Sequence, residues 1–204
     1  MIAPANNFNS AASSADMELM DAVIRCDPAR VEALLEAGAD PNEMENGDAA
    51  LIWAAWNNQT EIACLLVEYG ANVNKIGIAG GTAISGAVDF DNIELARLLI
   101  SKGADANETL LVDGITLLMS AASKGNKEMV QLLLDNGAVP EAVDKKGHSA
   151  VDYAVDHFHL EVAQLLREVI EPRRQAASAD KHDLLRTRAT KLTIKPIKTA
   201  GGPA

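Results

Sequence analysis

Four glycines recur along this chain at nearly constant intervals, and their spacing restricts the fold more than any other feature. Each glycine follows a similar apolar block, as in LLEAGADPN (34–42) and LLISKGADAN (98–107). They are Gly38, Gly70, Gly103 and Gly137, at steps of 32, 33 and 34 residues. A period near 33 residues indicates an array in which copies of one supersecondary unit stack on each other.

Each unit predicts two helices. The first-helix blocks, such as LIWAAWNN (51–58), carry small or apolar residues at i, i+3 and i+4, and the second-helix blocks do the same. Asp27-Pro28 predicts a helix start, because Asp accepts from free N–H groups and Pro fits the first turn. The four glycines predict helix ends that need a left-handed residue. Further capping residues are expected at Asn92 and Asn126 of second helices, and at Thr82, Thr116 and Ser149 of first helices.

The pattern G-x-T-x-L-x-x-A-A…L-L-L-x-x-G-A-x-x-N resembles the ankyrin repeat over about residues 17–168, most closely at 113–138. The resemblance implies an all-α solenoid of stacked helix-turn-helix pairs, with finger loops beside a concave groove. The family's Pro-Leu-His is absent, and AALI, TAIS, TLLM and SAVD take its place. The first unit has no capping threonine and the fifth has no Gly-Ala turn, as terminal repeats that face water would.

The chain is expected to contain three parts. A disordered segment covers residues 1–15, the repeat domain covers 16–171, and a basic, mostly disordered tail covers 172–204. The repeats are placed at about 14–45, 46–78, 79–111, 112–144 and 145–171. Because each helix pair buries its face only against its neighbours, we predict a monomer.

The net charge of −11 is unevenly distributed. Residues 1–171 hold 27 acidic and 10 basic residues, a balance of −17, and residues 172–204 hold 8 basic and 2 acidic residues, a balance of +6. An acidic body is not expected to bind nucleic acid. The tail could contact nucleic acid, an anionic membrane or the acidic body itself, or remain a plain solvated tail. Its KLTIKPIK segment (191–198) alternates apolar and polar residues, which allows a short strand on contact.

No pattern predicts a reaction centre, a cofactor or a metal. GIAGGT (77–82) lacks the lysine of a nucleotide-binding loop, so we interpret it as a flexible finger. Asp89 and Asp91 are interpreted as turn residues, and His157 and His159 point to different helical faces. We therefore expect no catalytic residue, no cofactor and no metal ligand, and an enzyme with an unrecognised site stays as the alternative.

Compartment and redox state follow from what the sequence lacks. The N-terminus has no basic and apolar signal pattern, and no window approaches 18 consecutive apolar residues, so we expect a soluble, cytoplasmic protein. The two cysteines, Cys26 and Cys64, are too few for a disulfide framework and are expected to be free thiols.

LIWAAWNN holds both tryptophans of a chain with few aromatic residues. The expected core stripe consists of Leu51, Ala54, Ala55 and Asn58. Trp53 and Trp56 then point about 160° and about 150° from its centre, to the side that lines the concave groove in ankyrin-like arrays. We predict that both rings anchor a peptide or helix of a partner protein. The alternative is that a tryptophan wedges between adjacent first helices.

Two further sets of residues extend the predicted binding surface. Asn57 lies one turn above Trp53, and the equivalent positions in other units supply Phe90, Tyr153 and His157 to an aromatic strip. Gly86 is expected to leave the ring of Trp53 open. The finger loops contribute Met44, Ile76, Ile78, Leu110 and Leu111. A row of exposed apolar residues makes a contact patch, although these side chains could instead pack against neighbouring fingers.

Overall fold

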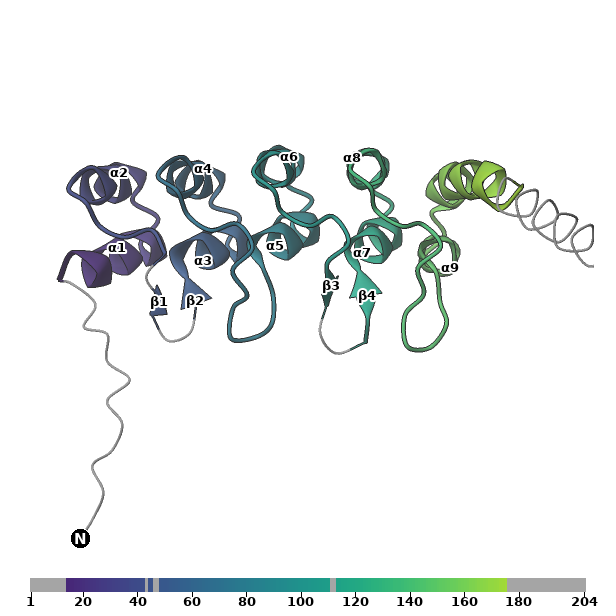
Figure 1. Ribbon diagram of the computed structural model, residues 1–204, viewed down its shortest axis with the longest axis horizontal. Coiled ribbons are helices and arrows are strands. Elements are labelled where there is room, and N and C mark those ends of the chain that lie inside the picture. The colour runs from purple at the N-terminus through teal and green to yellow at the C-terminus, as the bar shows by residue number, and fades with distance from the viewer. Residues whose placement is uncertain (1–13, 43, 46–47, 111–112, 176–204) are drawn as a thin grey trace, which may run out of the picture.

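The computed structural model describes residues 14–42, 44–45, 48–110 and 113–175, and these form a row of helix pairs in two layers (Figure 1). The inner layer contains α1 (Ser14–Ile24), α3 (Ala50–Trp56), α5 (Ala83–Asp89), α7 (Leu117–Lys124) and α9 (Ala150–Asp156). The outer layer contains α2 (Pro28–Glu36), α4 (Thr60–Glu68), α6 (Ile93–Ser101), α8 (Lys127–Asp135) and a helix over 160–175. This arrangement confirms the predicted all-α solenoid.

The helices begin and end where the capping residues predicted. Asp27 accepts from Arg30 N at 3.1 Å, and Pro28 opens α2. Side-chain caps also start α5, α6, α7, α8 and α9, at Thr82, Asn92, Thr116, Asn126 and Ser149 respectively. The four periodic glycines follow the outer helices with φ between +87° and +94°, a region that side chains rarely adopt.

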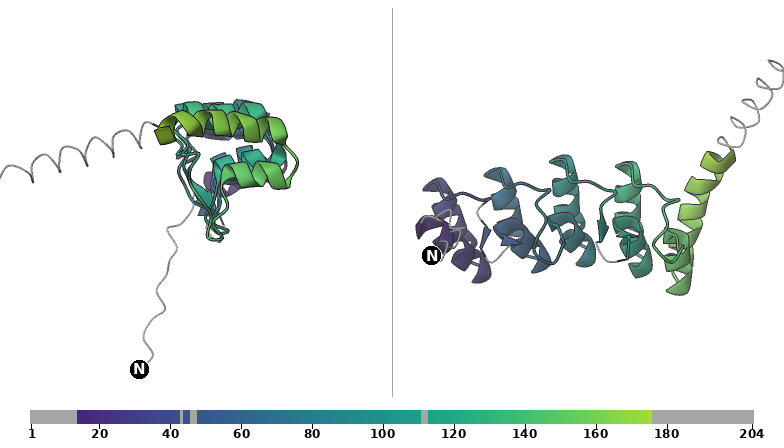
Figure 2. Two further views of the ribbon diagram at one scale, coloured as in Figure 1. Left: turned by 90° about the vertical axis from the view of Figure 1, so that its right-hand side faces the viewer. Right: turned by 60° about the horizontal axis from the view of Figure 1, so that its bottom comes forward.

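The core is aliphatic and alanine-rich, and it runs continuously along the row. Its largest buried side chains include Leu51, Leu66, Leu95, Met129 and Leu166. Inner helices pack on the next inner helix and outer helices on the next outer helix. Viewed along the row, the pairs lie behind one another with the fingers on one side (Figure 2). Each repeat is therefore stabilised by its neighbours.

Asparagine side chains connect consecutive repeats on the finger side. The Nδ2 groups of Asn42, Asn74 and Asn107 donate to the carbonyls of Gly70, Gly103 and Gly137, at 2.9 to 3.1 Å. A second set of bonds links the inner-to-outer turns, where Asn92 donates to Asn58 and Asn126 to Asp91. We call these two sets the asparagine ladders.

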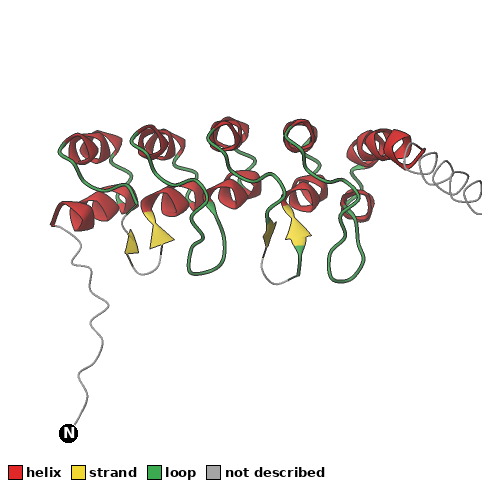
Figure 3. Ribbon diagram, viewed as in Figure 1, coloured by secondary structure: helices red, strands yellow, loops and turns green. Residues whose placement is uncertain are grey.

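The structure differs from the sequence prediction at several points. Two fingers are hairpins, β1 (Met44–Glu45) with β2 (Asp48–Ala49), and β3 (Thr109–Leu110) with β4 (Ile115–Thr116) (Figure 3). Asn58 is not in the core: it is exposed at φ +54°, because α3 ends before it and the chain turns toward α4. Asp91 has the same left-handed geometry, which confirms it as a turn residue.

The expected boundary at 171 falls inside a helix. The last outer helix continues to 175, past Pro172, because nothing at 171 ends it. The segment before residue 14 and the tail from 176 onward lie outside the described residues. None of the helices in the described part is long and apolar enough to cross a membrane.

Candidate functional site

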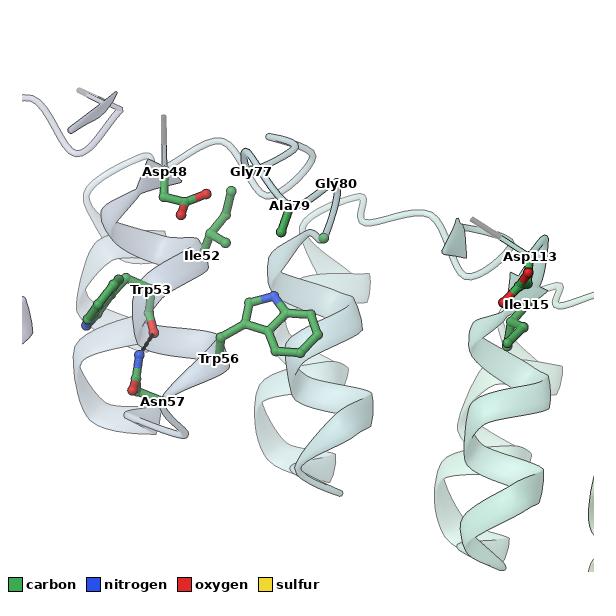
Figure 4. A pocket seen from close by; sticks show the side chains of 11 residues that line it. Asp48, Ile52, Trp53, Trp56, Asn57, Gly77, Ala79, Gly80, Asp113 and Ile115 are labelled. Carbon is green, nitrogen blue, oxygen red and sulfur yellow. Dashed lines mark hydrogen bonds between the residues drawn. The ribbon is translucent and has the colours of Figure 1, made fainter. Parts of the chain in front are cut away.

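A cavity of about 480 Å³ lies on the finger side of α3, between that helix, the loop 77–81 and the start of β4 (Figure 4). Its lining is mostly apolar. The lining residues are Asp48, Ile52, Trp53, Trp56, Asn57, Gly77, Ala79, Gly80, Gly81, Asp113 and Ile115. We call this cavity the α3 pocket. It contains three of the predicted site residues, Trp53, Trp56 and Asn57.

Trp56 forms a fixed wall of the α3 pocket because it packs against the next repeat. Its Nε1 donates to the carbonyl of Thr82 at 3.1 Å, and the residue is half-buried. A Cβ atom at Gly81 would lie 2.9 Å from the indole ring, and one at Gly86 would lie 3.2 Å from it. Gly86 therefore makes room for Trp56, and not for Trp53 as the sequence suggested. Trp56 has the wedged position that was the alternative.

Trp53 lies on the opposite side of α3 and is the open ring of the pair (Figure 4). Its side chain is 36% exposed. Its carbonyl accepts from Asn57 Nδ2 at 2.8 Å, which secures the last turn of α3. The two tryptophans thus play different structural parts, although they are three residues apart on one short helix.

The loop 77–81 closes the rim of the α3 pocket. Gly77 and Gly80 carry its internal hydrogen bonds, at 2.8 Å from Gly77 N to Gly81 O and from Gly80 N to Gly77 O. Asp48 Oδ1 accepts from Ile78 N at 2.9 Å and fixes the loop to β2. A Cβ atom at Gly77 would lie 2.3 Å from that carboxylate oxygen, so a side chain here would displace Asp48 from its bond to Ile78 N. The stretch GIAGGT is thus a finger loop that hydrogen bonds hold in one conformation.

The finger side chains are only partly described. Ile76 and Ile78 are 59% and 76% exposed, so neither is buried against a neighbouring finger. Met44 is in β1 and Leu110 is in β3, but their side chains lie outside the described residues, as does all of Leu111. A row of apolar fingers therefore stays a prediction beyond Ile76 and Ile78.

The remaining predicted residues lie elsewhere and do not line the α3 pocket. Phe90 caps the end of α5 and is 48% exposed. Tyr153 and His157 come together in the last repeat, with stacked rings 6.5 Å apart. Tyr153 also donates to Asp144 Oδ2 at 2.9 Å and meets His148 edge-on. The structure therefore brings Tyr153 and His157 together, leaves Phe90 apart from them, and places none of the three in the α3 pocket.

The cluster around Asp144 was not foreseen. Asp144 is almost fully buried, and burial alone would raise the pKa of its carboxyl. Hydrogen bonds from His148 N, Tyr153 OH and Lys146 N outweigh this effect and hold the pKa below its usual value. Burial raises the pKa of the Tyr153 hydroxyl, and its hydrogen bond to Asp144 raises it further.

Glu108 is a second carboxylate that sequence reasoning missed. Its Oε2 accepts from Thr82 Oγ1 at 2.6 Å, which joins the finger root of one repeat to the cap of α5. Burial raises the pKa of Glu108, although the bond from Thr82 opposes the shift. The two residues lie 26 positions apart, before α5 and after α6, so the local pattern of neither helix predicts this contact.

The described residues offer little for redox or metal chemistry. Cys26 and Cys64 are free thiols, as predicted, and burial raises the pKa of Cys64. A higher thiol pKa leaves less of the reactive thiolate. Within the described ranges, no three His, Cys, Asp or Glu side chains are grouped to hold a metal ion.

Comparisons with known proteins agree with this architecture. A family model described as Ankyrin repeats (3 copies) matches residues 7–77 and 84–176. The chain is 35% identical over 120 residues to an ankyrin repeat and KH domain-containing protein of Caenorhabditis briggsae, covering 58% of this chain and 5% of that protein.

Two other relatives match longer stretches at lower identity. Protein glp-1 of Caenorhabditis elegans is 31% identical over 176 residues, covering 76% of this chain and 13% of that protein. A glycerophosphocholine phosphodiesterase of Schizosaccharomyces pombe is 29% identical over 134 residues, covering 66% of this chain and 11% of that protein. The chain thus spans only a small part of the length of the relatives that it matches.

Proposed function

Because the chain belongs to the ankyrin repeat family, we propose that it is a protein-binding module that holds a partner's peptide or helix in its concave groove and against its finger loops. It would act as an adaptor, a scaffold or an inhibitor. We further propose that it works as a cytoplasmic monomer. Ankyrin repeats are generally interaction modules, and this proposal places the interaction at particular residues of this chain.

The observation that carries the proposal is the α3 pocket. It combines an apolar lining with an open tryptophan, Trp53, and with a second tryptophan, Trp56, that is fixed against the next repeat. Tryptophan in a preformed hollow is the residue type that most often dominates binding energy. Ile76 and Ile78 stand exposed on the adjoining finger and extend the apolar surface beyond the pocket. A peptide lying across both would bury these otherwise solvated groups.

An enzyme is the second class to consider. The relative in Schizosaccharomyces pombe carries the name of a phosphodiesterase, but this chain matches only 11% of that protein. No observation in the described repeats favours a reaction centre, so we keep the enzyme only as the alternative. Substrate analogues that raise the melting temperature of the protein, without any peptide, would favour the enzyme.

A peptide selection tests the proposal directly. Random peptides displayed on phage are selected on the full chain, and the products are then measured against Trp53→Ala and Ile78→Ser. We expect peptides whose affinity falls at least about tenfold in either variant, and whose binding shifts NMR signals of α3 and 77–81. Selected peptides that bind both variants as tightly as the natural sequence would contradict the proposed groove.

A further inference from the structure

The α3 pocket carries charge of one sign. Among the described residues that line it, the charged ones are Asp48 and Asp113, and none is Lys or Arg. One carboxylate oxygen of Asp48 is occupied by Ile78 N, at 2.9 Å. The side chain of Asp113 forms no ion pair with another described residue, and it lies beyond α5, far from Asp48 (Figure 4). The pocket is therefore an apolar hollow between two separate carboxylates.

These features define the chemistry of a matching occupant. Its centre must be apolar, because Ile52, Trp53 and Ile115 cannot replace the hydration of a buried charge. Its flanks should be basic, because cations at the rim meet the two carboxylates and an acidic body. An extended segment with aliphatic residues between lysines satisfies both conditions.

The chain itself contains such a segment. KLTIKPIK (191–198) has lysines at 191, 195 and 198, aliphatic residues at 192, 194 and 197, and no acidic residue. It belongs to the tail with a balance of +6, whereas residues 1–171 have a balance of −17. We infer that the segment 191–198 binds in the α3 pocket of its own chain.

The tail is long enough to reach the pocket. Fifteen residues, 176–190, separate 175, where the described part ends, from 191, and the sixteen extended steps between them span about 55 Å. The last repeat and α3 are three inner-helix steps apart, α9 to α7 to α5 to α3, which is roughly 30 Å at the usual packing distance. Residue 175 ends the outer helix of the last repeat, so part of the tether is used to pass to the finger side, and the remaining length covers the distance along the row.

Tethering makes even weak binding effective. Linking two binding elements in one chain supplies an effective concentration in the millimolar range, so a dissociation constant on the order of 1 mM still leaves about half of the tails bound. The inference rests on the proposed function, since both use the α3 pocket. It adds that a partner peptide must displace the tail, so the tail lowers the apparent affinity for any partner.

The two tryptophans give a selective readout, because both line the α3 pocket and no other tryptophan exists in the chain. Acrylamide quenching is measured for the full chain and for Lys195→Glu/Lys198→Glu. We expect the quenching constant to rise roughly twofold in the variant at low salt, as the tail leaves Trp53. In 1 M salt, where the screening length is about 3 Å, the difference should shrink.

A matched control keeps the test specific. Arg186→Glu/Arg188→Glu changes the tail charge by the same amount outside 191–198, and we expect its quenching to equal that of the natural chain. Equal quenching in all three proteins would overturn the inference, and so would equal rises in both variants, which would show a nonspecific attraction. A quenching difference that varies with protein concentration would assign the tail to a second copy and also overturn binding in its own chain.

A peptide added in trans separates this inference from the proposed function. A synthetic peptide of residues 188–201 is titrated into Lys195→Glu/Lys198→Glu, and we expect the tryptophan fluorescence to saturate. A peptide from the phage selection should bind this variant more tightly than the natural chain. If the selected peptide binds but residues 188–201 do not, the tail inference fails while the proposed function stands.

Discussion

Repeats two and five place aromatic residues at equivalent positions and use them in opposite ways. α3 begins at Ala50 and α9 at Ala150, so Trp53 corresponds to Tyr153. In both helices the side chain four residues later contacts the aromatic residue's carbonyl at 2.8 Å. The Tyr153 hydroxyl donates to the carboxylate of Asp144, and the Tyr153 ring contacts the rings of two histidines. Trp53 instead lines the apolar α3 pocket and is 36% exposed.

The difference arises from the neighbours and not from the helix. Ile52 and Trp56 of α3 are replaced by Asp152 and Asp156 in α9. Repeat two also borders the glycine loop 77–81, which leaves space over the helix. The same backbone position therefore supports a closed polar cluster in one repeat and an open pocket in another.

The largest expected effect comes from removing the wall of the α3 pocket. Trp56→Ala should lower the free energy of unfolding by about 3 kcal/mol, because it deletes a packed ring and leaves a void. The melting temperature should fall by roughly 10 °C. Asp156→Ala, the equivalent change in repeat five, is the control and should stay within about 0.5 kcal/mol. Thermal melts followed by circular dichroism measure the stability of both variants. If Trp56→Ala is as stable as Asp156→Ala, the Trp56 ring does not stabilise the contact between repeats.

Removing the open ring should affect binding and not folding. Trp53→Ala should weaken a selected peptide about 30-fold, while the melting temperature changes by only about 2 °C. Isothermal titration calorimetry measures the affinity. His157→Ala in repeat five is the comparison, and we expect its affinity to stay near that of the natural chain. An equal loss in His157→Ala would show that the partner contacts both repeats. Repeats two and five would then not differ in binding.

The cluster around Asp144 and Tyr153 in repeat five should lose its stabilising effect in acid. Tyr153→Phe removes a hydroxyl donor from Asp144 and should lower the melting temperature by about 3 °C at pH 7. The pKa of Asp144 is depressed in the folded protein, so the stability that it contributes is complete above its unfolded pKa of about 3.9. That stability is lost as the pH falls through the folded pKa.

Melting curves from pH 7 to pH 3 measure this response. The difference between the natural chain and Tyr153→Phe should stay constant down to about pH 4 and shrink below it. A difference that persists unchanged at pH 3 would mean that the hydroxyl stabilises the repeat by a contact other than Asp144.

The smallest effect is expected at Glu108, which lies between the two regions. Burial raises its pKa in the folded protein, so any stability tied to this group is present below the unfolded pKa and is lost as the pH rises through the folded pKa. At pH 7, Glu108→Gln should therefore raise the melting temperature by about 1 °C, since glutamine still accepts from Thr82 without the buried charge. A fall of several degrees in a thermal melt would contradict this.

Most of the fold could be predicted because its signals are local. The periodic glycines, Asp27-Pro28 and Thr82 each act within a few residues of their own helix, and the structure confirms them. The hairpins and the extension of the last helix to 175 were missed, because the fingers lack strand alternation and Pro172 suggested an end.

The site was less accessible to sequence reasoning. A helical wheel treated Trp53 and Trp56 alike, because both point away from the stripe of α3. Their different environments are set by Gly81 and Gly86, which belong to the next repeat and make room for one ring only. The contact between Tyr153 and Asp144 likewise joins a helix to its preceding finger. Such contacts depend on how neighbouring segments stack, which the pattern of one helix does not contain.

The asparagine ladders have a mechanical consequence. The amide of Asn42 donates to Gly70 of the next repeat, and the amide of Asn107 donates to Gly137 of the repeat after its own. Tension applied to the two ends of the row is therefore carried in series, junction by junction. A helix pair that detaches from one end leaves the bonds farther along unbroken. The array should thus extend under load as a spring that yields one repeat at a time.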